Sequence, residues 1–410
     1  MDIIAPILAT TPHDHWKITV QNVFQQPNLH PFQDTTIQFL EALSKHILLD
    51  RSMRAYPELM AMAHWLRKAH IVELRKEYEQ RTAGKYILAR GTIIHFAPAN
   101  VDSVFIYSWI LSMLAGNKNI IRLSRRTNEQ TDILMRKINE VISRAEFEAI
   151  ADRTLLVRYS YEQEYTAYLS EQCDVRVLWG GDQSVRTIRA IPLAPNAVEL
   201  VFPNRYSKSV LNAEAVLQAD GSAIAVLGKQ FYNDALWYGQ LACSSPREIF
   251  WIGSSELIAA AKERFWKSME QVLQKEHYYN EPALNMLRLA TSDYYAAQQQ
   301  TGHVYNSYAS TPVRVEVSEA DFQLRDMHCG GGLFLEYGLS ELEQLHQHIH
   351  ERDQTLSYFG FDRQQLAQWA MGIPNRGIDR IVPVGQALDF GSVWDGYDLF
   401  TYFSREIAIL

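Results

Sequence analysis

The sequence has 410 residues, more than one hydrophobic core usually organises, so two domains are expected. Hydrophobic residues make up 47% of the chain and charged residues 21%, which is the composition of a globular protein and excludes a disordered scaffold. With 39 basic against 47 acidic side chains the formal net charge is -8, which argues against nucleic acid and anionic membranes as partners.

The first 85 or so residues have a mainly helical pattern. They begin with MDIIAPILATTPHDHW, which lacks the basic segment and apolar stretch of a signal peptide. The uncharged stretch from Ser103 to Asn117 is shorter than the roughly 18 apolar residues of a membrane helix, and we interpret it as a buried helix. We therefore expect a cytoplasmic protein without a membrane span.

Short β-branched runs then alternate with helical stretches. The runs that predict buried parallel strands are 91–97, 119–124, 154–159 and 175–180. The helical stretches between and after them are 101–114, 128–142 and 183–190. This βαβ alternation is typical of a Rossmann-type nucleotide-binding sheet. We assign residues 1–225 to a helical N-terminal region followed by this cofactor domain.

The pattern breaks around Gly221 to Gly228, where we place the domain boundary. A second α/β domain is expected over residues 226–384. Its elements are a helix leading into YGQLACSSP, a strand at 247–253, an amphipathic helix at 255–275, a glycine-rich segment at 329–335 and a strand at 379–384. We expect the last segment, 385–410, to end in a short helix near 397–407 and to return to the cofactor domain or to an oligomer interface.

The three cysteines, Cys173, Cys243 and Cys329, are too few and too scattered for a disulfide framework or a zinc cluster. No histidine grouping has metal-binding spacing either, so we expect no metal. Cys243 lies among small polar residues in GQLACSSPR (239–247), between the end of a predicted helix and the start of a predicted strand. Backbone amides at such a turn can stabilise both a thiolate and an oxyanion. Cys173 has the context of a structural residue, and Cys329 beside His328 is the competing thiol.

The segment GQLACSSPR resembles the nucleophile segment of aldehyde dehydrogenases and, more closely, that of LuxC-type fatty acyl reductases. The stretch from Ala97 to Thr127 is similar to the superfamily's stretch in which P-x-N precedes a helix, AGN and a basic strand end. The segments 354–360 and 377–405 are similar to the LuxC-type C-terminal region. The resemblance covers roughly residues 85 to 405 and implies an aldehyde dehydrogenase-like α/β fold.

The resemblance also implies a reaction. Cys243 would attack a long-chain fatty acyl thioester, and Asn100 with the Cys243 backbone N–H would stabilise the oxyanion. The thioacyl group would then be reduced to the fatty aldehyde. The acyl donor could be acyl-CoA, acyl carrier protein or an acyl-protein synthetase, and a homo-oligomer is expected. Without the resemblance, Asn100 would be interpreted as a helix cap, because it immediately precedes an apolar helix, and the two roles are compatible.

The cofactor assignment rests on the strand end that carries Arg122, Ser124 and Arg125. By the resemblance, Arg122 matches a ribose-contacting lysine, and Arg125 stands where NAD-preferring relatives carry a glutamate. Guanidinium groups bind phosphate, so we expect NADPH rather than NADH and call residues 1–225 the NADP-binding region. Gly180 and Gly181 suit the approach of a pyrophosphate to a helix N-terminus.

Oxidising relatives need a glutamate base to hydrolyse their thioacyl intermediate. Aligning Arg205 with the lysine of their motif puts Val201 at the glutamate position, which favours reduction. Glu199 lies two residues away, on the same strand face, and would serve as the base if the chain were an oxidative aldehyde dehydrogenase. A non-catalytic subunit of a reductase complex is the alternative from another functional class.

Overall fold

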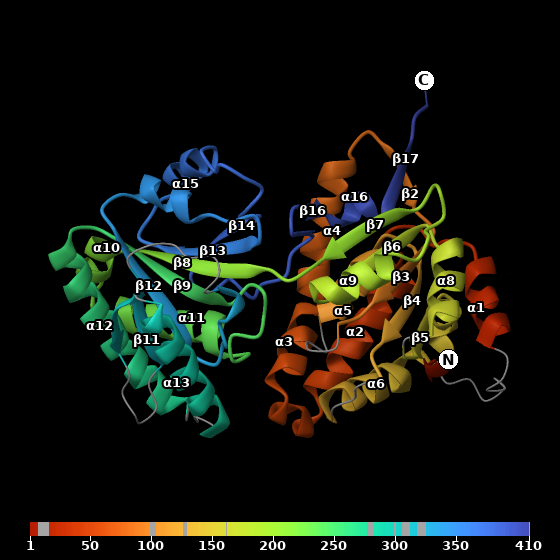
Figure 1. Ribbon diagram of the computed structural model, residues 1–410. Coiled ribbons are helices and arrows are strands. Elements are labelled where there is room, and N and C mark those ends of the chain that lie inside the picture. Colours follow the sequence, from red (N-terminus) through yellow and green to blue (C-terminus); the bar gives the residue numbers. More distant parts are fainter. Residues whose placement is uncertain are drawn as a thin grey trace. The chain divides into compact units, whose positions relative to one another are not determined.

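The computed structural model describes residues 1–6, 16–98, 104–125, 129–160, 162–276, 282–298, 301–305, 312–317 and 325–409. They form two compact units, each built on its own β-sheet (Figure 1). The first unit comprises residues 1–203 and 391–410, and the second comprises residues 204–390.

The sheet of the first unit has six strands, and all neighbouring pairs are parallel except β1 with β5. In spatial order the strands are β1 (Asp2–Ala5), β5 (Thr154–Arg158), β4 (Lys118–Leu123), β3 (Thr92–Phe96), β6 (Val175–Trp179) and β7 (Val198–Phe202). All five residues of β3 and of β6 are buried, as expected of parallel strands covered on both faces.

Helices connect these strands in sequence order. They are α5 (Val104–Leu114), α6 (Glu129–Ile142), α7 (Glu148–Ala151), α8 (Gln163–Gln172) and α9 (Asp182–Arg189). From β3 the chain moves outward through β4 to β5, and then crosses to the other side of β3 through β6 and β7. The strand order therefore reverses between β3 and β6, and in such sheets ligands bind at this switch point, beyond the carboxyl ends of the strands.

The rest of the first unit comes from the two ends of the chain. The N-terminal helices are α1 (Trp16–Gln25), α2 (Asp34–Leu48), α3 (Pro57–Trp65) and α4 (Lys68–Thr82). Strand β2 (Tyr86–Ala89) pairs antiparallel with β17 (Ser404–Ile407), which follows the short helix α16 (Leu399–Tyr402). No helix in the described part of the chain is both long and apolar enough to cross a membrane.

The second unit contains a seven-stranded sheet. In spatial order the strands are β10 (Thr301–Tyr305), β11 (Val313–Val317), β12 (Leu333–Leu339), β9 (Pro246–Ile252), β8 (Tyr206–Asn212), β13 (Asp353–Phe359) and β14 (Arg380–Pro383). Only the edge pair β10 and β11 is antiparallel. The helices of this unit are α10 (Ala213–Gln218), α11 (Gly221–Leu236), α12 (Ser255–Lys275), α13 (Pro282–Ala297) and α15 (Arg363–Ala370), and a 3-10 turn, η3, spans Leu342–His348.

The boundary between the units falls after Pro203, whereas the sequence pattern placed it after residue 225. Residue 225 lies inside the continuous helix α11, which begins at Gly221 because the Asp220 side chain accepts hydrogen bonds from the backbone N–H groups of Ser222 and Ala223. Gly228 is a packing residue, since a Cβ there would lie 2.8 Å from Ser268 Oγ of α12. The glycines that suggested a boundary thus serve a helix start and a close helix contact.

The C-terminal segment also differs from its expected form. A short helix was predicted near 397–407, but only Leu399–Tyr402 is helical and Ser404–Ile407 is strand β17. Residues 391–410 fold with the first unit. The pairing of β17 with β2, more than 300 residues earlier in the chain, could not be inferred from the local pattern.

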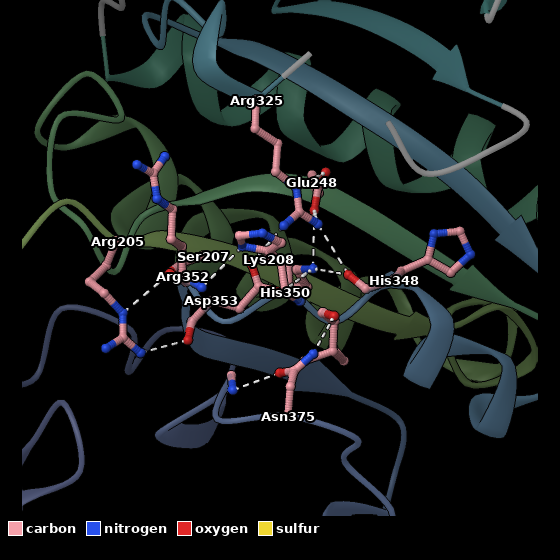
Figure 2. Close-up of polar contacts among 12 residues, drawn as sticks. Arg205, Ser207, Lys208, Glu248, Arg325, His348, His350, Arg352, Asp353 and Asn375 are labelled. Carbon is pink, nitrogen blue, oxygen red and sulfur yellow. Dashed lines mark hydrogen bonds and ion pairs between the residues drawn. The ribbon is translucent and has the colours of Figure 1, made fainter. Parts of the chain in front are cut away.

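Four charged side chains lie in the core of the second unit (Figure 2). Lys208 Nζ is 2.7 Å from Asp353 Oδ2 and 3.2 Å from Glu248 Oε2. The Arg325 guanidinium reaches the same two carboxylates, each at 3.0 Å. Both cations also donate to the backbone carbonyl of His348. Two cations thus face two carboxylates, so this ionic cluster is neutral and joins β8, β9 and β13 to the segment that begins at Arg325.

The charges of the ionic cluster hold the Glu248 carboxylate ionised. Burial opposes ionisation, but Arg325 and Lys208 outweigh it and lower the pKa of Glu248 to about 2 from its ordinary value of 4.5. The resulting stabilisation is fully present above the unfolded pKa and is lost as the pH falls through 4.5 towards 2.

We expect Glu248→Gln to lower the free energy of unfolding at pH 7 by about 3–5 kcal/mol, because it leaves two buried cations against one carboxylate. Urea unfolding at pH 7, 5 and 3.5 measures this difference. It should shrink at pH 3.5, because Glu248 of the unfolded wild-type chain takes up a proton below pH 4.5 while the folded chain still holds it ionised. Glu263→Gln, on the exposed face of α12, is the control and should have little effect. A difference between wild type and Glu248→Gln that stays constant down to pH 3.5 would contradict this role of the charge.

Candidate functional site

Cys243 lies on the turn between α11 and β9. After Leu236 the backbone N–H of Gly239 donates to the carbonyl of Leu236, and that of Gln240 donates to the carbonyl of Ala235, which closes the helix. Gly239 and Gln240 both adopt left-handed conformations, with φ of 55° and 61°. Such a φ is common for glycine but unusual for glutamine, so the Gln240 backbone must be held in place by other contacts.

The Gln240 side chain supplies those contacts. Its Nε2 donates to the carbonyls of Pro246 and Leu333, at 3.1 and 3.0 Å. Its Oε1 accepts from the backbone N–H groups of Gly332 and Leu333, at 2.8 and 3.1 Å. The side chain is completely buried. One amide thus ties the Cys243 turn to the first residues of β9 and of β12.

A glycine loop packs against the same turn. Gly330, Gly331 and Gly332 all have positive φ, and the N–H of Gly331 donates to the carbonyl of Gly239 at 2.9 Å. A Cβ on Gly330 would lie 3.4 Å from the Gly239 carbonyl oxygen. The MHCGGG segment that held the competing thiol is therefore a structural support for the Cys243 turn.

The three thiols differ in exposure, and burial raises the pKa of two of them. Cys243 is exposed, whereas Cys173 is buried in the first unit, where burial raises its pKa to about 12. Cys329 is half-buried, and burial raises its pKa as well. His328 does not activate Cys329, because its Nδ1 accepts from the N–H of Gly330 and burial lowers its pKa to about 3, which keeps the ring neutral. Cys243 is the thiol best placed to meet a substrate.

The carbonyl of Cys243 points to the sheet. It accepts a hydrogen bond of 2.6 Å from the hydroxyl of Ser207 on β8. Sequence reasoning did not find Ser207, Gln240 or the ionic cluster as parts of this site. A lysine inside the strand YSKSVLN and a glutamate inside REIFWI were the only available indications, since charged residues in buried strands are rarely unpaired.

The candidate cofactor residues all belong to the first unit. Arg122 is on β4, Ser124 and Arg125 follow that strand directly, and Gly180 and Gly181 follow β6. All five lie at the carboxyl ends of β4 and β6, the two strands that flank β3, and the switch point lies between β3 and β6. Asn100 follows β3, but it lies outside the residues that the structure describes.

Arg122 and Arg125 differ in burial and in their polar contacts. Arg122 is partly buried and donates to the carbonyls of Tyr159 and Ser160, and its guanidinium lies over the Tyr159 ring at 5.3 Å. It therefore fixes the end of β5, with fewer donors left for a ligand. Arg125 is exposed and faces Glu162 at 3.9 Å, a contact too long and too solvated to hold it firmly.

The glycine pair opens helix α9. The N–H of Gly180 donates to the carbonyl of Phe202 in β7, and the carbonyl of Gly181 accepts from Val185 as the first bond of the helix. Residue Asp182 begins α9 and places a carboxylate in its first turn. A pyrophosphate at this helix start would therefore have to be placed away from that carboxylate.

Glu199, the candidate hydrolytic base, forms ion pairs with two arginines. Its Oε1 accepts from Arg176, with nitrogen contacts of 2.9 and 2.5 Å, and its Oε2 lies 2.8 Å from Arg189 Nε. Arg176 and Glu199 are direct neighbours on β6 and β7. Val201, at the aligned glutamate position, packs against the core of the first unit. Neither residue is arranged to take a proton from a water molecule.

Comparisons with known proteins agree with the sequence resemblance. The family model described as acyl-CoA reductase (LuxC) matches residues 28–405. The long-chain acyl-protein thioester reductase of Aliivibrio fischeri is 22% identical over 169 residues, which is 40% of this chain and 33% of that protein. Long-chain acyl-protein thioester reductase 2 of Photobacterium leiognathi is 25% identical over 172 residues, 41% of this chain and 33% of that protein. The matched segment thus spans about a third of these curated relatives.

Solved structures establish the fold. A benzaldehyde dehydrogenase from Corynebacterium glutamicum superposes with a TM-score of 0.62 at 14% identity, covering 95% of this chain and 86% of that one. An oxidoreductase from Marinobacter aquaeolei gives a TM-score of 0.67 at 10% identity, covering 95% and 90%. The aldehyde dehydrogenase-like α/β fold predicted from sequence is confirmed.

We expect iodoacetamide to label Cys243 first, Cys329 more slowly and Cys173 only after unfolding. Raising the pKa of Cys173 from 9.0 to about 12 lowers its thiolate fraction on the order of a thousandfold at pH 8, in addition to blocking access. Peptide mass spectrometry over a time course measures the three rates. Labelling of Cys329 as fast as Cys243 would contradict the assignment of the accessible thiol.

Proposed function

The chain belongs to the acyl-CoA reductase (LuxC) family, and from this we propose that it reduces a fatty acyl thioester to the fatty aldehyde with NADPH, through a thioacyl group on Cys243. The observation that carries the proposal is the exposed thiol of Cys243 on a turn fixed by the buried amide of Gln240. A nucleophile needs both access and a fixed geometry, and this turn supplies both.

The first step belongs to Cys243. Its thiolate attacks the carbonyl carbon of the substrate thioester, the bond from that carbon to the leaving sulfur breaks, and the acyl group remains on Cys243 Sγ. The departing thiolate is a good leaving group and takes up a proton from solvent. We assign oxyanion stabilisation to the Cys243 backbone N–H and Asn100.

The features of the first unit fit a nicotinamide cofactor. The strand order reverses beside β3, Gly180 and Gly181 bring backbone close to a helix start, and exposed Arg125 offers a cation beyond the end of β4. Such a cofactor would supply the hydride that converts the thioacyl group to the aldehyde. We assign its 2′-phosphate to Arg125 and a supporting role at the strand end to Arg122 and Ser124. Loss of the aldehyde returns Cys243 to the thiolate.

The ion pairs of Glu199 favour reduction of the thioacyl group over its hydrolysis. A hydrolytic enzyme must activate water against the thioacyl group, and the carboxylate nearest to the aligned base position is committed to Arg176 and Arg189. With Glu199 held by the two arginines, the thioacyl group persists until it is reduced. This supports an acyl thioester as substrate and an aldehyde as product.

The wild-type protein should oxidise NADPH and form tetradecanal when supplied with tetradecanoyl-CoA or tetradecanoyl acyl carrier protein. In Cys243→Ala we expect this rate to fall on the order of a thousandfold or more, because the covalent step is lost. Cys329→Ala is the matched control and should stay within about threefold, since that thiol takes no part in the chemistry. Absorbance at the NADPH band and chromatography of the aldehyde give the readout. Oxidation of tetradecanal to the free acid with no thioester reduction would overturn the proposal.

Arg125→Ala tests the cofactor. Losing charge-assisted hydrogen bonds to a 2′-phosphate should raise KM for NADPH about 10- to 100-fold while KM for NADH stays within about threefold. Glu162→Gln removes the carboxylate that faces Arg125, so it should keep or strengthen the preference for NADPH. Initial rates with both cofactors give the comparison. An equal change for NADPH and NADH in Arg125→Ala would remove Arg125 from phosphate recognition.

A further inference from the structure

Ser207 lies at an irregular point of the second sheet. Along β9, Ser207 is paired with Pro246 and Lys208 with Glu248, so Arg247 is an extra residue between two pairs. Along β13, Tyr206 is paired with Asp353 and Lys208 with Leu356, which leaves two residues opposite Ser207. Both neighbouring ladders are therefore interrupted at the level of this one serine, and Pro246 has no N–H to offer.

The hydroxyl of Ser207 fills this interruption. It accepts from the backbone N–H of Thr355 at 3.2 Å and donates to the carbonyl of Cys243 at 2.6 Å. A serine hydroxyl has one proton to donate, and here it goes to the Cys243 residue. The Ser207 side chain is fully buried, so its hydroxyl is shielded from solvent although Cys243 is exposed. One hydroxyl thus connects the turn that carries the thiol to the interior of the sheet.

The bond orients the Cys243 residue itself. Gln240 fixes the backbone three residues earlier, and the N–H of Ser245 closes the turn on the carbonyl of Ala242. Ser207 draws the carbonyl of Cys243 inward while the residue remains exposed. Without this bond the peptide that follows Cys243 can rotate, and conformers that withdraw the thiol from solvent become populated.

We propose that Ser207 is a positioning residue for the nucleophile, which it holds through the Cys243 carbonyl without touching the substrate. The inference rests on the proposed function for its effect on turnover. Its effect on the Cys243 thiol is independent of that function. Bulges beside reactive groups commonly redirect the chain, and here the bulge provides the space in which the serine reaches Cys243.

Ser209 provides a matched control. It lies two residues further along β8, on the same face, and is also fully buried. Its hydroxyl bonds to that of Ser357 on β13, and among the described residues it makes no hydrogen bond to the Cys243 turn. Ser209→Ala therefore removes a buried serine hydroxyl from the same strand and leaves the nucleophile held as before.

The experiment compares Ser207→Ala, Ser207→Thr and Ser209→Ala with wild type. For each protein, we would measure kcat and KM with tetradecanoyl-CoA and NADPH, the iodoacetamide rates at Cys243 and Cys329, and the thermal unfolding midpoint. In Ser207→Ala, kcat should fall about tenfold with KM within about twofold, the loss expected for one buried hydrogen bond. Labelling of Cys243 should slow at least threefold, and labelling of Cys329 should not change.

The other variants separate positioning from stability. Ser209→Ala should lower the unfolding midpoint by a similar amount yet keep kcat and both labelling rates within about twofold of wild type. Ser207→Thr keeps the hydroxyl and should keep the wild-type Cys243 rates. Equal effects of Ser207→Ala and Ser209→Ala, or a Ser207→Thr protein as slow at Cys243 as Ser207→Ala, would overturn the inference. If wild type reduced no thioester but Ser207→Ala still slowed labelling of Cys243 alone, the proposed function would fail and the positioning role would stand.

Discussion

The side-chain amide of Gln240 is the constraint on which the rest of the candidate site depends. It makes four hydrogen bonds to backbone groups of Pro246, Gly332 and Leu333, at the starts of two neighbouring strands. It does so with a left-handed backbone that no isolated glutamine would favour. The turn that carries Cys243, the glycine loop after Cys329 and the starts of β9 and β12 all meet at this side chain. Cys243 is exposed, whereas the backbone three residues before it is held by these four bonds.

The candidate site residues of the two units lie at opposite ends of their strands. In the first unit the candidate cofactor residues follow parallel strands, at the carboxyl edge where a doubly wound sheet leaves backbone N–H groups and helix starts available. In the second unit Cys243 precedes β9, so it lies at the amino end of a central strand. The amino end of a parallel strand offers no ready-made binding site. The Cys243 segment is instead fixed by the buried hydroxyl of Ser207 and the amide of Gln240, and the ionic cluster lies beside them.

Much of the fold could be predicted because buried parallel strands have a simple local pattern. The runs at 91–97, 119–124, 154–159 and 175–180 agree with β3, β4, β5 and β6 to within one residue at each end, and the helix 255–275 agrees with α12 at both ends. The prediction failed where a residue serves a distant partner. Gly228 was interpreted as a break because its contact with Ser268 is invisible in sequence, and β17 was interpreted as a helix because its partner is β2.

In the candidate site too, local features could be predicted from sequence, whereas contacts with distant residues could not. The accessibility of Cys243 could be inferred from the small polar residues around it, and the structure places that cysteine on an exposed turn. The contacts of Glu199 and Ser207 could not be inferred, because Arg176 reaches Glu199 from the neighbouring strand and Ser207 reaches Cys243 across a bulge. A sequence gives the residue types, but these pairings depend on strand register.

The central claim is the covalent thioacyl group on Cys243, and the most direct measurement is to trap it. The protein is incubated with tetradecanoyl-CoA in the absence of any nicotinamide cofactor, and its intact mass and peptide masses are recorded. The account predicts one tetradecanoyl group per chain, located on the peptide that contains Cys243, which disappears when NADPH is added. An unmodified protein, or an acyl group on Cys329 in place of Cys243, would contradict it.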